Sequence, residues 1–378
     1  MISPPPTRIL LLAACFLALA LPRGFALLNI DGARNQVFVF GNLSFAYNSN
    51  IFSDATGRGD YSMTATAGMD LKRRAGIIAV NATLKFDYQT FQTYTDQNAV
   101  NPSFSIEFNK TTGRTTGAFT INAFRETRSD SAVNLRTSSW NFPLGLSLKY
   151  PVNDKLYITS GTTYLQRRYT DTTTLANLMD YSQSLDLFYV YTSKLDLIGG
   201  YRIRVSKTSL GNDSSDHWFN VGATGGLFAK LNGTVRVGYQ IRDTAGAGGE
   251  SFTHINALAS LGWPVTRKLS LAGQVSRDFN TIATGSSVDS SSANVSASYS
   301  YNRKLDFNTG VSYGRNLFLG AAALGRHDDF FSWDAGTSYK FNEHLRLGAS
   351  YTYFRNWSTL RFSEFTRQGF TFDVSSRF

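Results

Sequence analysis

Residues 195–206 read LDLIGGYRIRVS, and their side chains alternate between two kinds. Leu195, Leu197, Gly199, Tyr201, Ile203 and Val205 share one face, whereas Asp196, Gly200, Arg202, Arg204 and Ser206 share the other. A period of two with one apolar face is typical of a half-buried β-strand. The pattern recurs at 78–88 and 345–353, and each run covers about 10–13 residues, as a tilted strand that crosses a bilayer does.

The composition is that of a membrane protein without membrane helices. Charged residues make up 17% of the chain, aromatic residues make up 14%, and no apolar run after residue 26 is long enough to span a bilayer. A closed barrel is the other way to satisfy every backbone group inside a membrane. Composition alone also allows a soluble β-sandwich or β-helix, but the long alternating runs favour the barrel. Aromatic residues near the run ends predict two aromatic girdles: Tyr61, Tyr88, Tyr191, Trp263, Tyr299, Tyr301 and Tyr339.

The connectors between the predicted strands alternate between short turns and longer polar loops. The short ones are 72–74, 109–115, 151–154, 192–194, 229–232, 264–267, 302–304 and 341–344; the longer ones include 48–60, 170–180, 243–250 and 280–287. Eight turns join sixteen strands, and further strands near 37–47 and 369–378 bring the total to about 18. The sequence therefore predicts an all-β, transmembrane antiparallel up-and-down β-barrel, with residues 27–378 as one domain and both termini in the periplasm.

The first 26 residues have the pattern of a secretory signal peptide. Arg8 precedes the apolar run 9–21, and Gly24 and Ala26 are the small residues that signal peptidase accepts before a cut. That run has 13 residues, fewer than the roughly 20 that a membrane helix needs. Cleavage after Ala26 lowers the formal charge from +10 to +8, because two arginines are lost.

Cys15, the only cysteine, allows a second interpretation. Residues 12–15 read LAAC, which also fits an acylation motif of bacterial lipoproteins. Acylation at Cys15 would leave the apolar residues 16–21 on the mature chain, so we favour cleavage after Ala26. The mature chain would then contain no thiol, as suits the oxidising periplasm.

The last residues end in an alternating strand with a terminal aromatic. Phe370, Phe372, Val374 and Phe378 face one way, and Gly369, Thr371, Asp373, Ser375 and Arg377 face the other. A terminal Phe after such a strand resembles the C-terminal signal that the barrel assembly machinery recognises in Gram-negative outer-membrane proteins. Phe378 is therefore the expected assembly signal, and the bacterial outer membrane is the expected location.

Two motifs in the first quarter of the chain carry a family resemblance. Residues 47–52 read YNSNIF after the first predicted strand, and residues 86–91 read FDYQTF at the end of the third. They resemble the putative β-barrel porin 2 family, which includes outer-membrane barrels linked to exopolysaccharide export. The resemblance implies a porin or a role in polysaccharide exit.

Catalysis finds little support in the sequence. The histidines, His217, His254, His327 and His344, lie far apart and lack metal-ligand spacing. His254 and Asn256 would share the lumen face, as in outer-membrane phospholipase, but the nucleophilic Ser two residues after the His is replaced by Asn256. His327-Asp328-Asp329 resembles the acid–His pairs of outer-membrane proteases, but a solvated polar loop explains it more simply. We therefore expect neither an enzyme nor a bound cofactor or metal.

The predicted lumen carries charges of both signs. Inward basic residues are Lys85, Lys149, Arg202, Arg204, Arg236, Arg242 and Arg346; inward acids are Asp70, Asp87, Glu107, Asp186, Asp196, Asp278, Asp306, Asp334 and Asp373. The pore-lining candidates are Arg202, Arg204, Arg236 and Arg242 on one wall, facing Asp278, Asp306 and Asp334 on another. Between the two arginine strands, only Asn220, Gly222 and Thr224 are expected to face inward. Separated charges would create a transverse field, whereas paired charges would plug the lumen.

The surplus positive charge lies largely at the short turns. Its members include Lys72, Arg73, Arg74, Lys110, Lys155, Lys194, Lys230, Arg267, Lys268, Arg303 and Lys304. They would contact lipid phosphates, or they would draw an anionic solute or polysaccharide to the inner mouth. Nucleic-acid binding is not expected, because this charge rings a membrane rim.

The sequence thus predicts a porin-like channel for hydrophilic solutes, or an accessory to exopolysaccharide export. Barrels of about 18 strands usually keep an aqueous channel. The alternative is a non-conducting structural or adhesive barrel whose interior Arg–Asp pairs close the lumen. The expected partners are outer-membrane lipids, the barrel assembly machinery and the transported solute.

Overall fold

The computed structural model describes residues 28–30, 34–74, 76–170, 175–245, 249–320 and 325–378. The predicted signal peptide, with Cys15 and the cleavage site at Ala26, lies outside the described residues.

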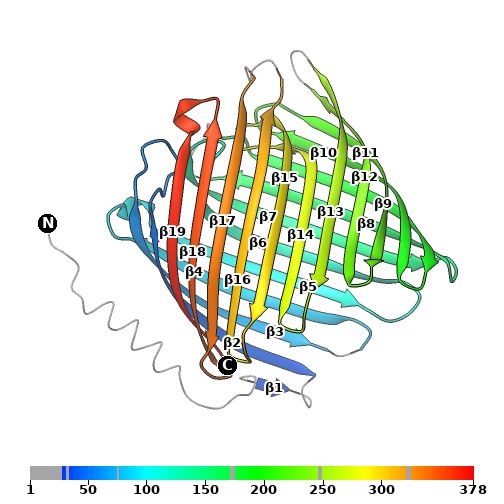
Figure 1. The fold of residues 1–378 in the computed structure, drawn as a ribbon, viewed down its shortest axis with the longest axis horizontal. Coiled ribbons are helices and arrows are strands. Elements are labelled where there is room, and N and C mark those ends of the chain that lie inside the picture. Colours follow the sequence, from blue (N-terminus) through cyan, green and yellow to red (C-terminus); the bar gives the residue numbers. More distant parts are fainter. Residues whose placement is uncertain (1–27, 31–33, 75, 171–174, 246–248, 321–324) are drawn as a thin grey trace.

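Eighteen long antiparallel strands, counted over the described residues, close into a barrel (Figure 1). Each strand pairs with the next one along the chain, and β19 pairs with β2 to complete the ring. The strands are β2 (Asn35–Asn48), β3 (Asp60–Arg73), β4 (Ala79–Phe91), β5 (Ala99–Lys110), β6 (Thr116–Asp130), β7 (Leu135–Pro151), β8 (Leu156–Tyr169), β9 (Leu178–Thr192), β10 (Leu195–Thr208), β11 (Ser214–Phe228), β12 (Leu231–Thr244), β13 (Ser251–Pro264), β14 (Leu269–Thr281), β15 (Ser287–Ser300), β16 (Leu305–Phe318), β17 (His327–Lys340), β18 (Leu345–Ser358) and β19 (Phe365–Arg377). The predicted fold class is confirmed.

The eight short turns predicted from the sequence all join consecutive strands, and they lie on one rim of the barrel. The strands have 12 to 17 residues, more than the alternating runs suggested. Alternation ends where a strand leaves the apolar belt, but backbone pairing continues through polar residues, as at the end of β6. In Figure 1 the strands β14 to β19 cross those of the opposite wall, β2 to β7, at a steep angle. This crossing is the strand tilt of a closed barrel.

Both described ends of the chain lie at the short-turn rim. Val39 of β2 exchanges two backbone hydrogen bonds with Phe378, at 2.9 and 2.8 Å. A short strand, β1 (Leu28–Ile30), pairs with residues 35–37 of β2. It lies on the same edge of β2 as β19, just beyond the end of β19. Two short 3-10 turns, η1 (Thr95–Gln97) and η3 (Arg361–Ser363), lie in the longer loops.

No helix among the described residues is long and apolar enough to cross a membrane.

The outer surface of the barrel is apolar. Val221 and Ile255 are each 63% exposed, and similar side chains recur at alternate positions of most strands. A continuous exposed apolar surface of this extent marks contact with lipid. Tyr61, Tyr191 and Trp263, all exposed, lie near strand ends.

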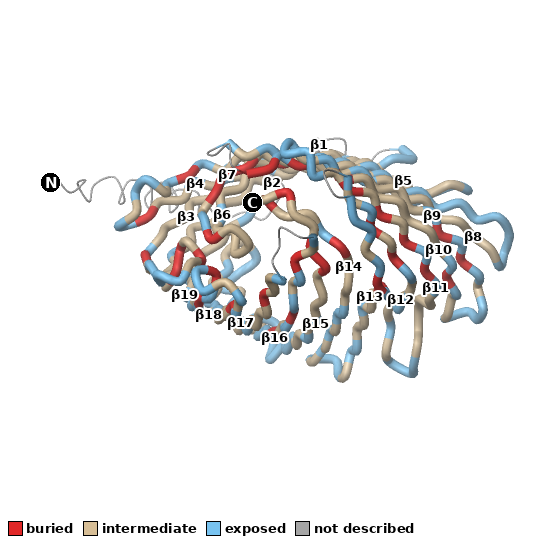
Figure 2. Tube along the Cα trace, turned by 90° about the horizontal axis from the view of Figure 1, so that it is seen from above, coloured by how far each residue is buried: buried red, intermediate tan, exposed pale blue. Residues whose placement is uncertain are grey.

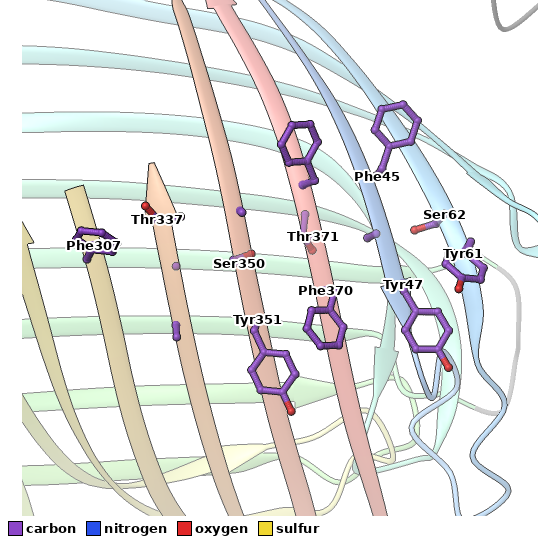
Figure 3. A pocket seen from close by; sticks show the side chains of 15 residues that line it. Phe45, Tyr47, Tyr61, Ser62, Phe307, Thr337, Ser350, Tyr351, Phe370 and Thr371 are labelled. Atoms are coloured by element: carbon purple, nitrogen blue, oxygen red, sulfur yellow. The ribbon is translucent and has the colours of Figure 1, made fainter. Parts of the chain in front are cut away.

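A shallow groove of about 680 Å³ runs over this outer surface across β16 to β19, β2 and β3 (Figure 3). Small residues line it at Ala335, Thr337 and Ala349, and Phe307 and Phe370 stand on either side. The groove belongs to the lipid-facing surface, whereas the polar residues of interest lie inside the barrel.

Candidate pore-lining site

The inward side chains of β9 to β13 form rows that cross five neighbouring strands. The middle row is Ser184, Arg202, Trp218, Gln240 and His254; the row nearer the long loops is Ser182, Arg204, Asp216, Arg242 and Phe252; the row nearer the short turns is Asp186, Gly200, Asn220, Gly238 and Asn256. Figure 2 shows how often buried positions recur on these strands. Several of them are polar or charged, so the barrel has a polar core on this side.

Asp216 of β11 lies between two arginines at the centre of this core. Its carboxylate accepts hydrogen bonds from Arg204 at 2.6 Å and from Arg242 at 2.6 and 2.8 Å. The side chains of Asp216 and Arg242 are almost fully buried, at 1% and 0% exposed. A buried charge is tolerated only when it is paired and hydrogen-bonded, so these three residues stabilise one another.

Asp278 of β14 is the second carboxylate of the cluster, and it lies at the edge of the open lumen. Arg202 donates to both of its oxygens at 3.0 Å, and Gln240 donates at 2.8 Å. Arg204 also contacts it, at 3.4 Å. Because β10 and β14 are four strands apart, about 19 Å along a sheet, this contact requires part of β14 to leave the wall and lean inward.

The ladder between β13 and β14 shows where β14 leaves the wall. Pairing runs from Pro264–Ser270 to Ala257–Arg277 and then stops, although both strands continue toward the long loops. Beyond this point the ring of Phe279 stacks on the inward-facing His254, with centroids 4.0 Å apart. The paired ends of β14 and β15, residues 278–288, therefore fold over the inner face of the wall. We call this segment the inner hairpin.

Arginine side chains replace the missing ladder bonds of the inner hairpin. The carbonyl oxygen of Phe279 accepts a hydrogen bond from Arg204, and that of Asn280 accepts one from Arg242 at 2.9 Å. Arg242 also lies over the Phe279 ring, 5.3 Å from its centroid. The buried arginines thus hold both the acids of the core and the backbone of the hairpin.

His254 and Asn256 share the lumen face, as the sequence predicted. Both bond to the same oxygen of Gln240, at 3.1 and 2.5 Å. His254 also lies 3.1 Å from a carboxylate oxygen of Asp289. His254 and Asn256 are therefore part of the packed polar core.

The long loops meet over this end of the barrel. Ala176, in the β8–β9 loop, donates a backbone hydrogen bond to Ala283 at the tip of the inner hairpin, at 2.7 Å. Ser363, in the β18–β19 loop, donates to Asn134 of the β6–β7 loop at 2.6 Å. Asn134 in turn donates to the carbonyl of Ser53 in the β2–β3 loop. Loops from opposite walls are therefore tied together across the mouth.

The opposite wall of the lumen is lined mostly by small residues. Because Asp278 faces inward, the pairing register identifies the inward-facing residues of β15 to β19. The inward residues there include Ser292, Asn294, Ser296, Asn308, Gly310, Ser312, Ser332, Gly336, Ser338, Gly348, Ser350, Thr352, Gly369, Thr371 and Ser375. Ser350, Thr352 and Asn308 are exposed. We call β15 to β19 the open wall and β9 to β14 the packed wall.

The predicted pore-lining residues divide between these two walls. Arg202, Arg204, Arg242 and Asp278 come together in the core, whereas Arg236 pairs separately with Asp186 at 2.8 Å. Asp306 lies at the short-turn rim and pairs with Lys340 at 3.1 Å. Asp334 is exposed on β17 and makes no ion pair with any described residue.

Two features of the predicted lumen are wrong. Asn220, Gly222 and Thr224 are not the only inward residues of β11, because Asp216 and Trp218 also face inward. They continue the same alternation beyond the apolar belt, so the period of two contained the signal for them. Asp278 is also paired with Arg202 rather than held apart from it, because the inward lean of the hairpin is not visible in alternation.

Residues 200–378 match the putative beta-barrel porin 2 family. The resemblance seen in the sequence is thereby confirmed, although residues 47–52 and 86–91 lie outside the matched part. A search of curated proteins gives no match.

Solved porin structures share the fold of this barrel. OccAB3 of Acinetobacter baumannii is 11% identical with a TM-score of 0.51, and the alignment covers 92% of this chain and 99% of that one. OccK2 (OpdF) of Pseudomonas aeruginosa is 10% identical with a TM-score of 0.51, covering 91% and 97%. At this identity the likeness concerns the fold alone.

The protein is therefore a porin-like β-barrel of the bacterial outer membrane. The family that residues 200–378 match is described as one of porins. Its apolar exterior fits a lipid bilayer, and its interior combines a packed charged wall with an open polar one.

Proposed function

We propose that this barrel is a channel for small hydrophilic solutes, closed at its long-loop mouth in the conformation described. The open wall carries the proposal, because exposed hydroxyl and amide groups along five neighbouring strands provide a wettable path beside the packed wall. A recess of about 460 Å³ next to Lys85, Asp87 and Asn101 continues this polar surface onto β4 to β6. Barrels of this strand number keep an aqueous channel.

In this proposal the inner hairpin and the long loops form the barrier. Conduction requires the hairpin tip to separate from the β8–β9 loop, where Ala176 bonds to Ala283. The Arg204–Asp216–Arg242 cluster stays in place as part of the wall, because its three residues project from β10, β11 and β12 and bond to one another.

A disulfide across this contact tests the proposal. A Cβ built at Gly285 would lie 3.4 Å from the Cβ of Ala176, close to the separation in disulfides. We expect the pair Ala176→Cys and Gly285→Cys to show no single-channel conductance when oxidised, and conductance in planar bilayers after reduction. Gly285 has a positive φ of 79°, so the Gly285→Cys single variant is the control for backbone strain.

A non-conducting structural barrel is the second candidate, favoured by the buried Arg–Asp cluster on the packed wall. In that case neither the wild-type protein nor a variant with a loosened hairpin would conduct. Conductance in either one excludes this candidate.

The family resemblance also supports a role in exopolysaccharide export, with a polymer in place of a small solute. A strain that lacks the protein would then secrete less polysaccharide, and the oxidised disulfide variant would fail to restore secretion. Unchanged secretion in the deletion strain would leave the small-solute channel as the proposal.

We infer that the short-turn rim faces the periplasm, as in barrels with longer outer loops. Both described chain ends lie there, and Phe378 completes the seam against Val39. This placement supports recognition of Phe378 by the barrel assembly machinery. It also places the basic turn residues beside lipid phosphates.

A further inference from the structure

The environment of Asp278 is that of a bound carboxylate. We propose that Arg202, Arg204 and Gln240 form a binding site for the carboxylate group of a small solute, occupied in this conformation by the side chain of Asp278. The inference rests on the proposed channel function and names the ligand class for its lumen.

The donors and the acceptor of this site come from different structural units. Arg202, Arg204 and Gln240 project from β10 and β12 of the packed wall, whereas Asp278 begins the inner hairpin, which has left the ladder of β13. Two guanidinium groups and an amide converge on one carboxylate. Charge-assisted hydrogen bonds of this kind are the strong ones, and arginine suits planar carboxylates.

The two carboxylates of the core differ in how accessible they are. The Asp216 side chain is 1% exposed, whereas those of Asp278 and Arg202 are 28% and 20% exposed. A solute in the lumen can therefore reach the Asp278 position and not the Asp216 position. Asp216 belongs to the fold, and Asp278 is the exchangeable occupant.

The site also contains donors that Asp278 leaves unused. Arg202 Nε and Trp218 Nε1 are buried and have no hydrogen-bond partner among the described residues. The Trp218 ring lies under the guanidinium of Arg202, 4.6 Å from its centroid. Such donors, beside an aromatic face, favour a ligand with more acceptor atoms or more apolar surface than an aspartate side chain.

Exchange of the occupant would couple binding to opening of the channel. A solute carboxylate that takes the place of Asp278 removes a contact that holds the inner hairpin to the wall. By linkage, a ligand that binds only the released state shifts the equilibrium toward that state. A negatively charged solute would thus favour its own passage.

Benzoate and benzamide provide a matched pair of probes, because they differ only in the charged group. Binding is measured on the detergent-solubilised full-length barrel by tryptophan fluorescence, with Trp218→Phe to identify the signal of Trp218. The test variant is Asp278→Asn, and Asp334→Asn on the open wall is the control. We expect Asp278→Asn to bind benzoate about tenfold more tightly than the wild type, because the competing occupant has lost its charge. Asp334→Asn should bind benzoate as the wild type does.

The double variant Asp278→Asn, Arg202→Gln should lose benzoate binding, and benzamide should bind to none of these proteins. Equal affinity for benzoate and benzamide, or benzoate binding that survives Arg202→Gln, would overturn the site. The fluorescence assay measures binding independently of conductance. A barrel that binds benzoate but never conducts would therefore refute the proposed channel and support the binding site. A conducting barrel that binds no benzoate would do the opposite.

Discussion

The two walls of the lumen have the same backbone pattern but opposite interiors. On the packed wall, β9 to β14, large charged and aromatic side chains meet across several strands and exclude water. On the open wall, β15 to β19, the inward positions are mostly Ser, Thr, Asn and Gly, and several are exposed. Strand geometry fixes which face a residue takes, but side-chain size decides whether that face becomes core or channel surface.

The difference also separates two uses of charge inside one barrel. Asp216 and Arg242 are buried and mutually satisfied, so they contribute to stability. Asp334 lies on an exposed surface without an ion pair among the described residues, so its charge is not needed to satisfy a buried partner. Mutations that exchange these roles test the comparison.

The largest effect is expected for Asp216→Asn. Loss of this charge leaves Arg204 and Arg242 buried without their main partner, which costs about 3–5 kcal/mol. Urea unfolding in detergent, followed by the gel shift between folded and unfolded barrel, measures this cost. Asp334→Asn is the matched control, with a change of about 0.5 kcal/mol or less. Similar destabilisation by the two variants would mean that the walls do not differ as described.

A smaller free-energy change is expected for Phe279→Ala, which removes the ring that anchors the inner hairpin to His254. Truncation of a buried phenylalanine to alanine costs about 3 kcal/mol. Here it destabilises the closed conformation, in which the ring is buried, relative to the open one. The ratio of open to closed channels should rise about a hundredfold in single-channel recordings. Phe370→Ala, on the exposed outer surface, should leave gating unchanged. A closed Phe279→Ala channel would show that the hairpin is not the barrier.

Ser350→Arg tests the open wall by adding charge without removing a contact. Ser350 is exposed, so we expect stability to change by about 0.5 kcal/mol or less. The ion selectivity should shift about threefold toward anions through the added field, as measured by reversal potentials in a salt gradient. Ser206→Arg on the packed wall is the counterpart. Ser206 is 1% exposed and bonded to Asp180, so this variant should fold poorly.

The smallest effect on stability is expected at the seam, which belongs to neither wall. Deletion of Phe378 removes two backbone hydrogen bonds to Val39 and a ring stacked on His344, with centroids 5.3 Å apart. At an exposed strand end, these contacts contribute about 1 kcal/mol to the free energy of unfolding. The amount of protein in the outer membrane should nevertheless fall severalfold if, as we propose, the barrel assembly machinery recognises the terminal residue. Phe341→Ala, at the same rim, should assemble normally.

Much of this architecture could be predicted from the sequence, because it depends on local patterns. Alternation at 195–206 placed Arg202 and Arg204 inward, and the short turns fixed the order of the strands. The meeting of Arg202 with Asp278 could not be predicted, because it depends on where the β13–β14 ladder ends. Asp216 could have been found, since it continues the alternation of β11 beyond its apolar residues.

The break in the β13–β14 ladder also affects how the chain tolerates changes in length. One residue inserted into β13 after residue 258, or into β14 before residue 277, would shift the register of that strand, and its inward side chains beyond the insertion would turn toward lipid. Residues 282–286 connect the end of β14, which no longer pairs with β13, to the start of β15, which still pairs with β16, so an insertion there displaces no paired residue of the wall. The tip of the inner hairpin is thus the part of the lumen that can gain or lose residues while the barrel keeps its shape.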